Sequence, residues 1–347
     1  KMSKSLGNGV DPLEIIEQYG ADALRLTLIT GNAPGNDMRW SEAKLNNSRN
    51  FANKLWNASR YILMNLPEDM TKAVLPKNLP IEDKWLLSLY NELVRDVTSN
   101  IDAYEFGIAC GKVYDFIWDI YCDWYIELTK PRIAEGGETA KAAQNVLVYV
   151  MAGLLKLLHP FMPYITEEIW QSMPVDDQPE SIMISQWCEY DKSLSFPKEQ
   201  EDFGKIIDAV KAIRVQRSEL NVPPSKKASL EIETKDKELF ESCAVFFTRL
   251  AGASSVEIKE KVDSAEGKMT AVTSAARLFM PKGQLVDAEK EAARLDKEIK
   301  AVQKDIDFLS KKLNNPGFLA KAPKEQIENE RAKLEKAEEK MRKLTQK

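Results

Sequence analysis

The sequence predicts a mainly α-helical protein with a helical bundle, a small α+β module and a C-terminal antiparallel coiled-coil hairpin. Through most of the first 224 residues, apolar residues recur every three or four positions, which is the pattern of amphipathic helices. Alternation of apolar and polar residues, typical of strands, is confined to residues 225–281. In residues 282–347, apolar residues step by four and three in two arms that NNPGF separates, so the chain is expected to fold back there.

Residues 1–40 are expected to hold a lysine- and serine-rich loop and two short helices. Asp11 before Pro12 has the pattern of a helix N-cap followed by proline at the first helical position. The helices PLEIIEQY and ADALRLTLIT join near Gly20, and GNAPGND is a turn cluster. We therefore treat this stretch as a domain segment separate from the helices after residue 40.

Residues 41–224 are expected to form a helical domain with a connector. A long amphipathic helix is predicted for residues 41–66, and further helices continue up to about residue 173. A proline- and acid-containing connector occupies residues 174–197. The last helix of this domain is predicted to end just before Pro223.

The α+β module is expected at residues 225–281 and the hairpin at residues 282–347. KASLEIET and SSVEIKEK alternate like strands, KELFESCAVFFTRLAG between them has a helical pattern, and MTAVTSAARLFMP is predicted as a third strand. In the hairpin, Leu295, Ile299 and Val302 begin an apolar seam that Ile327 and Leu334 resume.

Composition and charge limit the functional classes. The net charge of −5 argues against a wholesale nucleic-acid coat, but residues 287–347 hold 16 Lys and Arg against 13 Asp and Glu, a local balance of +3. No apolar run approaches the length of about 20 residues that spans a membrane, and no signal segment opens the chain, so a cytoplasmic protein without membrane contact is expected. The cysteines lack C-x-x-C spacing, which predicts neither a disulfide framework nor a metal site.

The opening KMSKS pairs lysines and hydroxyls in a way that suits a phosphate-handling loop. Lysine ammonium groups neutralise charge on phosphate oxygens, and hydroxyls and backbone N–H groups add hydrogen bonds. The candidates are Lys1, Ser3, Lys4 and Ser5. A lysine and serine string of this kind is also common on surfaces, so a frayed terminus is the alternative.

KMSKSLGN followed by DPLEIIEQYGADALRL resembles the signature loop and following helix of class I aminoacyl-tRNA synthetases, in the branch for valine, isoleucine and leucine. GNAPGNDMRW, SRNFANKLWNASRYILMNL, YDFIWDIYCDWYIELTK, LHPFMPYITEEIW, RSELNVPPSKK and LNNPGFLAKAP look like the bacterial valyl-tRNA synthetases. The isoleucine enzymes usually end in a zinc-binding region with paired cysteines, which this spacing lacks. The resemblance favours valine, with the isoleucine and leucine relatives as alternatives.

The resemblance implies an enzyme that ligates valine to tRNA(Val) with ATP and Mg²⁺. It assigns Lys4 as the direct contact to the ATP phosphates, with Ser3 and Ser5 beside it and Lys1 as a second catalytic lysine. The family's H-I-G-H-type motif has two histidines, whereas His159 in LHPFMP does not match it. We therefore expect a C-terminal fragment without the valine pocket and editing domain, monomeric, and inactive in valine activation on its own.

By the same resemblance, the helical domain binds the anticodon stem and loop, and the hairpin packs on the outer corner of the tRNA. Candidates on the helix of residues 41–66 are Asn46, Arg49, Asn50, Asn53, Lys54, Asn57 and Arg60. Arg214 and Arg217, beside Lys211, form a predicted basic strip for RNA backbone, and the hairpin candidates are Arg294, Lys297, Lys304, Lys311, Lys312, Arg331 and Lys340. The alternative is a non-catalytic helical module that binds a protein, with these charges on an ordinary solvated surface.

Aromatic residues crowd YDFIWDIYCDWYIE, and two interpretations are open. They could stack on bases of single-stranded RNA, or they could pack in the helical core, which is the favoured interpretation. His159 is expected to be a capping or core histidine.

Overall fold

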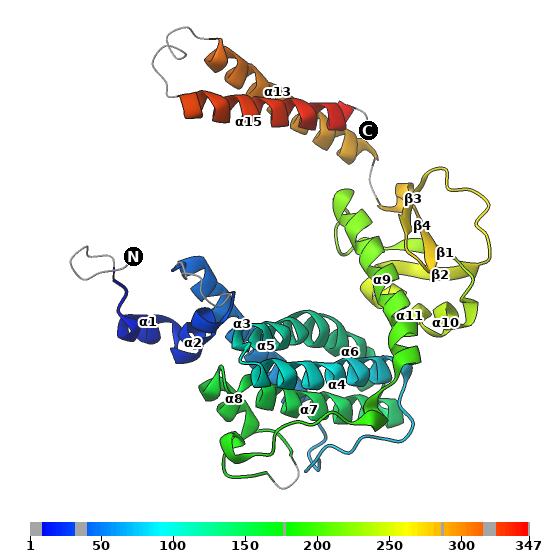
Figure 1. Cartoon of the computed structure of the whole chain (residues 1–347). Helices are drawn as coiled ribbons and strands as arrows, with labels where there is room; N and C mark the ends of the chain where they lie inside the picture. The colour runs from blue at the N-terminus through cyan, green and yellow to red at the C-terminus, as the bar shows by residue number, and fades with distance from the viewer. Residues whose placement is uncertain (1–8, 32–39, 176–177, 286–287, 315–323, 346–347) are drawn as a thin grey trace. The chain divides into compact units, whose positions relative to one another are not determined.

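The computed structural model describes residues 9–31, 40–175, 178–285, 288–314 and 324–345, and the chain divides into two compact units. The first unit is Lys1–Lys205 and the second is Ile206–Lys347, so the boundary falls inside helix α9 (Pro197–Glu219). The fold is mainly α-helical with one small sheet, which confirms the predicted fold class (Figure 1). The four predicted domains remain a prediction.

The first unit is helical throughout its regular structure. Its elements are α1 (Pro12–Tyr19), α2 (Ala21–Ile29), α3 (Glu42–Met64), α4 (Ile81–Asp102), α5 (Phe106–Asp115), η2 (Phe116–Tyr125), α6 (Ile126–Glu135), α7 (Gly137–Leu158), α8 (Pro163–Trp170), η3 (Ile182–Ile184) and η4 (Lys192–Leu194). As predicted, Asp11 caps α1 by accepting a hydrogen bond from the Leu13 N–H at 2.9 Å. Helices α4, α6 and α7 lie alongside one another (Figure 1).

Helix α7 is the core helix of this unit. Val146, Leu147, Met151, Leu154 and Leu155 are each 0% exposed. By length and composition alone α7 could cross a membrane, but 67% of its most apolar window is buried inside the protein. The core helix of a bundle has this composition because neighbouring helices cover it on several sides.

The run from α5 to α6 contains a π-helix, η2, where the sequence predicts regular helix. The Ile126 N–H donates to the Tyr121 carbonyl, five residues earlier. Phe116, Tyr121, Trp124 and Tyr125 of this π-helix are all buried. The spacing of apolar residues in a sequence does not distinguish an α-helix, whose N–H groups bond four residues back, from a π-helix, whose N–H groups bond five residues back.

Helix α2 is tied to two other helices. Asp22 accepts hydrogen bonds from the Tyr164 and Ile165 N–H groups at 3.3 and 2.7 Å, at the start of α8. Burial raises the pKa of Asp22, against the lowering effect of these hydrogen bonds. The hydroxyls of Thr27 in α2 and Ser48 in α3 lie 2.8 Å apart in the interior.

Side chains of α2 and α8 hold the turn between α7 and α8. Arg25 donates to the Phe161 and Pro160 carbonyls at 3.1 and 3.0 Å. His159 Nδ1 lies 2.8 Å from the Thr166 hydroxyl, and burial lowers the pKa of His159. His159 is thus the structural histidine that the sequence predicts.

The second unit contains the sheet. Its elements after α9 are β1 (Ala228–Thr234), α10 (Lys237–Ser242), α11 (Ala244–Leu250), β2 (Ala253–Lys259), β3 (Lys268–Val272), β4 (Ala276–Pro281) and α12 (Lys282–Leu285). The sheet has four strands in the order β2-β1-β4-β3, with β1 parallel to β2 and β4 antiparallel to both β1 and β3. MTAVTSAARLFMP is therefore two strands rather than the predicted one, because a tight turn closed by Thr273 N–H and Ala276 O, 2.9 Å apart, interrupts it.

The hairpin consists of α13 (Ala288–Leu313) and α15 (Lys324–Thr345), packed along each other (Figure 1). Val302 is 5% exposed, and other described residues of the seam are half-buried, among them Ile299, Ile306, Leu309, Ile327 and Leu334. The predicted seam is confirmed at these positions. Most of the link LNNPGFLAKAP, and the Leu295 side chain, lie outside the described residues.

Glu231 in β1 joins two lysines from neighbouring parts of the sheet. It pairs with Lys268 and, at 2.9 Å, with Lys259. Hydrogen bonds from Lys268 and then Lys259 lower the pKa of Glu231. A carboxylate with a lowered pKa stabilises the fold above its unfolded-state pKa, and this stabilisation is lost as the pH falls through the folded-state value.

We expect Glu231→Gln to lower the melting temperature of this unit by about 2 °C at pH 7, since an exposed ion-pair network contributes about 1 kcal/mol or less. The gap between wild type and variant should narrow as the pH is lowered below the ordinary carboxyl pKa of 4.5. Thermal unfolding from pH 7 to pH 3 measures this. Glu257→Gln, which removes a more exposed partner of Lys259, is the control, and a gap that stays constant with pH would contradict the assignment.

Candidate RNA-binding surfaces

Helix α3 separates an apolar face from a polar face. Leu45, Phe51, Leu55 and Ile62 are each 0% exposed and face the unit's interior. The candidates predicted from sequence on this helix are exposed: Asn46, Arg49, Asn50, Asn53, Asn57 and Arg60. Their spacing of three and four residues places them along one side of the helix, which we call the α3 face.

Lys54 is different from the other candidates on α3. Its Nζ donates to Asp123 Oδ1 at 2.6 Å and to the Trp118 carbonyl at 3.3 Å, and it lies 3.7 Å from the centroid of the Trp118 ring. Lys54 therefore joins α3 to η2, and its prediction as part of the exposed face is wrong. An ammonium group held over an aromatic ring and paired with a carboxylate is stabilising where it is partly desolvated.

An aromatic stack fixes α3 against the run of α5 and η2. The rings of Phe51 and Tyr114 are stacked with centroids 4.4 Å apart, and Tyr114 stacks on Trp118 at 5.9 Å. The Tyr121 hydroxyl donates to the Leu147 carbonyl at 2.7 Å. Four aromatic residues of this run are buried in the core, as favoured from sequence: Phe116, Tyr121, Trp124 and Tyr125. Tyr114 and Trp118 are half-buried and pack α3 against this run.

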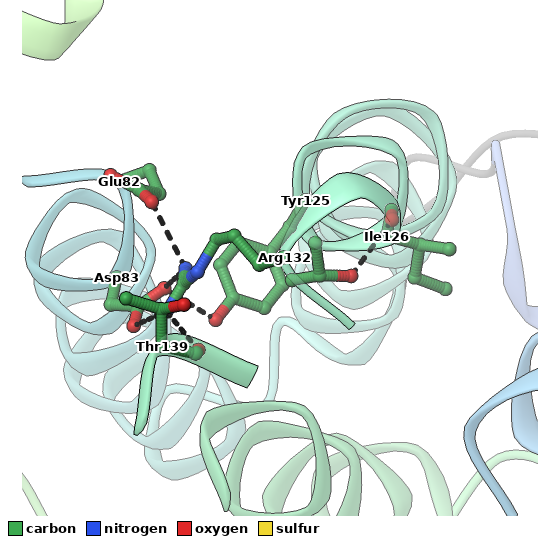
Figure 2. Close-up of polar contacts among 7 residues, drawn as sticks. Glu82, Asp83, Tyr125, Ile126, Arg132 and Thr139 are labelled. Atoms are coloured by element: carbon green, nitrogen blue, oxygen red, sulfur yellow. Dashed lines mark hydrogen bonds and ion pairs between the residues drawn. The ribbon is translucent and has the colours of Figure 1, made fainter. Parts of the chain in front are cut away.

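A buried charged cluster, which we call the Arg132 clamp, joins α4, η2, α6 and α7. Arg132 donates to Asp83 Oδ1 and Oδ2 at 2.6 and 2.8 Å, to Glu82 at 3.0 Å and to the Thr139 carbonyl at 2.9 Å. The Tyr125 hydroxyl donates to Asp83 at 2.8 Å. Figure 2 shows the guanidinium group between the two carboxylates and the Thr139 carbonyl.

The clamp perturbs the ionisation of its members. Burial raises the pKa of Glu82, and the neighbouring charge of Asp83 raises it further. Burial alone would lower the pKa of Arg132, but the hydrogen bonds and charges of Asp83 and Glu82 outweigh it and raise this pKa. The bidentate hydrogen bonds between Arg132 and the fully buried Asp83 fix the geometry of α6 relative to α4.

Arg214 and Arg217 differ in exposure, although they lie three residues apart on α9. Arg214 is exposed, and its Nε donates to the Leu250 carbonyl at 2.8 Å. Arg217 is only 7% exposed, and its Nη2 donates to the Lys226 and Pro223 carbonyls at 2.6 and 3.3 Å. Arg217 is therefore buried rather than part of an exposed strip, because its guanidinium group holds the loop after α9. The predicted contact of Arg214 and Arg217 with RNA backbone stays a prediction.

Three family models match separate parts of the chain. "Anticodon-binding domain of tRNA ligase" matches residues 83–233, "Valyl tRNA synthetase tRNA binding arm" matches 287–347, and "tRNA synthetases class I (I, L, M and V)" matches 1–41. The chain is 50% identical over 341 residues to the "Valine--tRNA ligase" of Clostridium acetobutylicum and 44% identical over 339 residues to that of Carboxydothermus hydrogenoformans. The chain belongs to the class I aminoacyl-tRNA synthetases. The family predicted from the motifs is thereby confirmed.

The chain spans 38% of the length of each of these two synthetases, and the alignments cover 97% and 96% of it. Among solved structures, a ternary complex of Agrobacterium radiobacter LeuRS is 20% identical, with a TM-score of 0.45, over 56% of this chain and 23% of that one. A Mycobacterium tuberculosis methionyl-tRNA synthetase is 25% identical, with a TM-score of 0.43, over 49% of this chain and 35% of that one.

The hairpin of α13 and α15 exposes some of the residues predicted to contact RNA. Lys304, Lys311 and Arg331 are exposed, whereas Lys312 is partly buried and pairs with Glu330 at 3.3 Å. Glu330 is 7% exposed and also pairs with Lys333 at 3.0 Å. The side chains of Arg294, Lys297 and Lys340 lie outside the described residues, as do Lys1, Ser3, Lys4 and Ser5 of the signature loop.

Cys110 is a buried thiol and Cys122 a partly buried one. Burial raises the pKa of Cys110 to about 12 and that of Cys122 to about 12, which makes both thiols unreactive at neutral pH. Within the described ranges, no group of His, Cys, Asp and Glu is arranged to hold a metal ion.

Sequence reasoning missed the Arg132 clamp. Glu82 and Asp83 stand in the first turn of α4, where acidic residues are ordinarily exposed and interact with the helix dipole. A weak signal was present in Pro131, because proline inside a helix marks a local irregularity beside Arg132.

Proposed function

We propose that this chain is the tRNA-binding region of a valyl-tRNA synthetase that ligates valine to tRNA(Val) with ATP and Mg²⁺. The observation that carries the proposal is the α3 face, a row of exposed amides and guanidinium groups on a helix fixed by an aromatic stack. Two family matches support tRNA binding by the chain: residues 83–233, which follow α3 in the sequence, match an anticodon-binding model, and residues 287–347 match a tRNA-binding arm. The relatives at 41–50% identity are named for valine.

The chemistry of the α3 face suits the bases of an anticodon loop. Unpaired loop bases expose donors and acceptors that asparagine amides and arginine guanidinium groups can pair with. Arg49 lies 5.9 Å from the Tyr19 ring, and Asn46 donates to the Glu42 carbonyl of its own helix at 3.0 Å, so both side chains are partly ordered. Side chains ordered in advance lose less conformational entropy when they bind.

The arm is proposed to contact the tRNA backbone. Lys304, Lys311 and Arg331 are exposed on helices whose apolar residues form the seam. Such contacts position an RNA without reading its sequence. The signature-loop residues Lys1, Ser3, Lys4 and Ser5 are proposed to act on the ATP phosphates, in a monomeric cytoplasmic enzyme.

Binding of the full chain to valine tRNA, to that tRNA with its middle anticodon base changed, and to isoleucine tRNA tests the proposal. We expect valine tRNA to bind best, with a penalty of about 1–3 kcal/mol for the changed base. Arg49→Gln and Arg60→Gln should reduce this discrimination. Arg95→Gln, at an exposed arginine of α4 paired with Asp96, is the matched control and should leave it unchanged.

A second function, a protein-interaction module, is favoured by the exposed apolar residues Tyr104, Phe106 and Ile108 at the turn from α4 to α5. Equal binding of all three RNAs would restrict the contacts to backbone and shape. If no RNA bound even at low salt, the tRNA-binding proposal would be rejected in favour of this alternative.

A further inference from the structure

A basic cavity lies in the second unit between the end of α9, the loop after this helix, and the end of α11. Its volume is about 640 Å³. The charged residues that line it are Arg214, Arg217, Lys227 and Arg249, and its described lining contains neither Asp nor Glu. We call it the Arg217 pocket.

Arg217 is a buried cation in the wall of this pocket. Its Nη2 hydrogen bonds go to the carbonyls of Pro223 and Lys226, which are neutral. Its Nη1 is buried and has no hydrogen-bond partner among the described residues. A buried charge is ordinarily paired with an opposite charge, because desolvation without compensation is unfavourable. The Arg217 guanidinium group therefore lacks the counter-charge that its burial calls for.

The backbone is shaped around this guanidinium group. Gly252 has a φ of +69°, and a Cβ at this position would lie 2.9 Å from Arg217 Cζ and 3.0 and 3.1 Å from Nη2 and Nη1. Glycine thus allows both the left-handed turn and the close approach. The turn between α11 and β2 therefore packs directly on the Arg217 guanidinium group.

The remaining basic residues reach the solvent side of the pocket. Arg214, Lys227 and Arg249 are all exposed, and the Arg214 guanidinium group is held by the Leu250 carbonyl. Ser218 and Thr248 add hydroxyls to the lining. Arginine and lysine donors around a concave site, with a buried cation behind them, match the charge and hydrogen-bonding needs of a phosphate group.

We propose that the Arg217 pocket takes one phosphate of the backbone of the RNA bound by this chain. Arg249, Lys227 and Arg214 contact the phosphate oxygens, and the phosphate supplies the counter-charge for Arg217. This inference rests on the proposed function for the source of the phosphate. It assigns the α+β module a backbone contact separate from the α3 face and the arm.

The test compares Lys227→Gln and Arg249→Gln with Lys226→Gln in titrations of the full chain with valine tRNA across a salt series. Lys226 is an exposed neighbour that does not line the pocket, so its variant removes the same charge outside the site. We expect each pocket variant to weaken binding about 3–10-fold, alike for tRNAs with different anticodons, and to reduce the salt slope by about 1. Lys226→Gln should stay within about twofold of wild type.

Equal effects of Lys226→Gln and Lys227→Gln would mean a diffuse basic surface and would overturn the pocket. Wild-type affinity in both pocket variants would overturn it as well, while leaving tRNA binding by the chain intact. Failure of the wild-type chain to bind tRNA would instead reject the proposed function. The substituted lysine and arginine are exposed, so unchanged circular dichroism melts should accompany all variants.

Inorganic phosphate distinguishes a bound RNA phosphate from a free anion. At matched ionic strength, phosphate is expected to compete with tRNA for the wild-type chain more strongly than chloride does, and this excess should disappear in Arg249→Gln. If phosphate raised the melting temperature of wild type but not of Arg249→Gln, and both bound tRNA equally, the pocket would hold a free anion and the proposal would be wrong.

Discussion

Asp83→Ala is expected to destabilise the first unit by about 3–5 kcal/mol, because it leaves the buried Arg132 without its bidentate partner. Asp83 is 0% exposed and accepts hydrogen bonds from both Arg132 and Tyr125. All seven tryptophans lie within residues 1–205, so tryptophan fluorescence during urea denaturation reports this unit in the intact chain.

Asp96→Ala is the matched control, since Asp96 pairs with Arg95 and Lys112 on a surface where its side chain is 41% exposed. Asp96→Ala should lower the free energy of unfolding by about 1 kcal/mol or less. The double variant Asp83→Ala/Arg132→Ala should lose less stability than the two single variants lose together, because neither buried charge remains without its partner. A loss below about 1 kcal/mol for Asp83→Ala alone would contradict a stabilising role for the Arg132 clamp.

Phe51→Ala is expected to lower the stability of the same unit by about 3–5 kcal/mol, through lost burial and the cavity that remains. Phe51 is 0% exposed, and its ring stacks on both Tyr114 and Trp118. Since the stack holds α3 in place, affinity for tRNA should also fall, although Phe51 itself cannot reach an RNA. Urea denaturation and tRNA titration measure the two effects.

Trp56→Ala tests whether the result is specific to the stack. Trp56 is on the same helix, is larger than phenylalanine and is 39% exposed, so we expect a loss of about 1 kcal/mol or less. A Phe51→Leu variant retains much of the apolar volume and should recover part of the stability. Equal losses for Phe51→Ala and Trp56→Ala would show that the aromatic stack has no special role.

Long periodic elements were predictable from the sequence. Helix α3 and the seam of α13 and α15 follow their apolar spacing, because burial of one face dominates the free energy of an amphipathic helix. The exposed α3 face follows from the same spacing. The signature loop was recognised from its motif, and its family is confirmed by the comparisons.

The features that the sequence could not predict depend on contacts between distant residues. Lys54 has the spacing of the α3 face, but Asp123 and Trp118 draw it to η2. Arg217 has the spacing of Arg214, yet carbonyls of the loop after α9 bury it. Residue type and spacing do not specify which of two neighbouring long side chains becomes buried, because this depends on backbone brought together only in the folded state.

Helix α2 is anchored to two neighbouring helices of the first unit. Asp22 bonds it to the start of α8, Thr27 bonds it to Ser48 of α3, and Arg25 bonds it to the turn before α8. The helix that comes soon after the signature loop therefore shares its position with the helix that carries the α3 face. If α3 moved when RNA bound, these hydrogen bonds would require α2 to move with it, so the position of α2 would then depend on what occupies the α3 face.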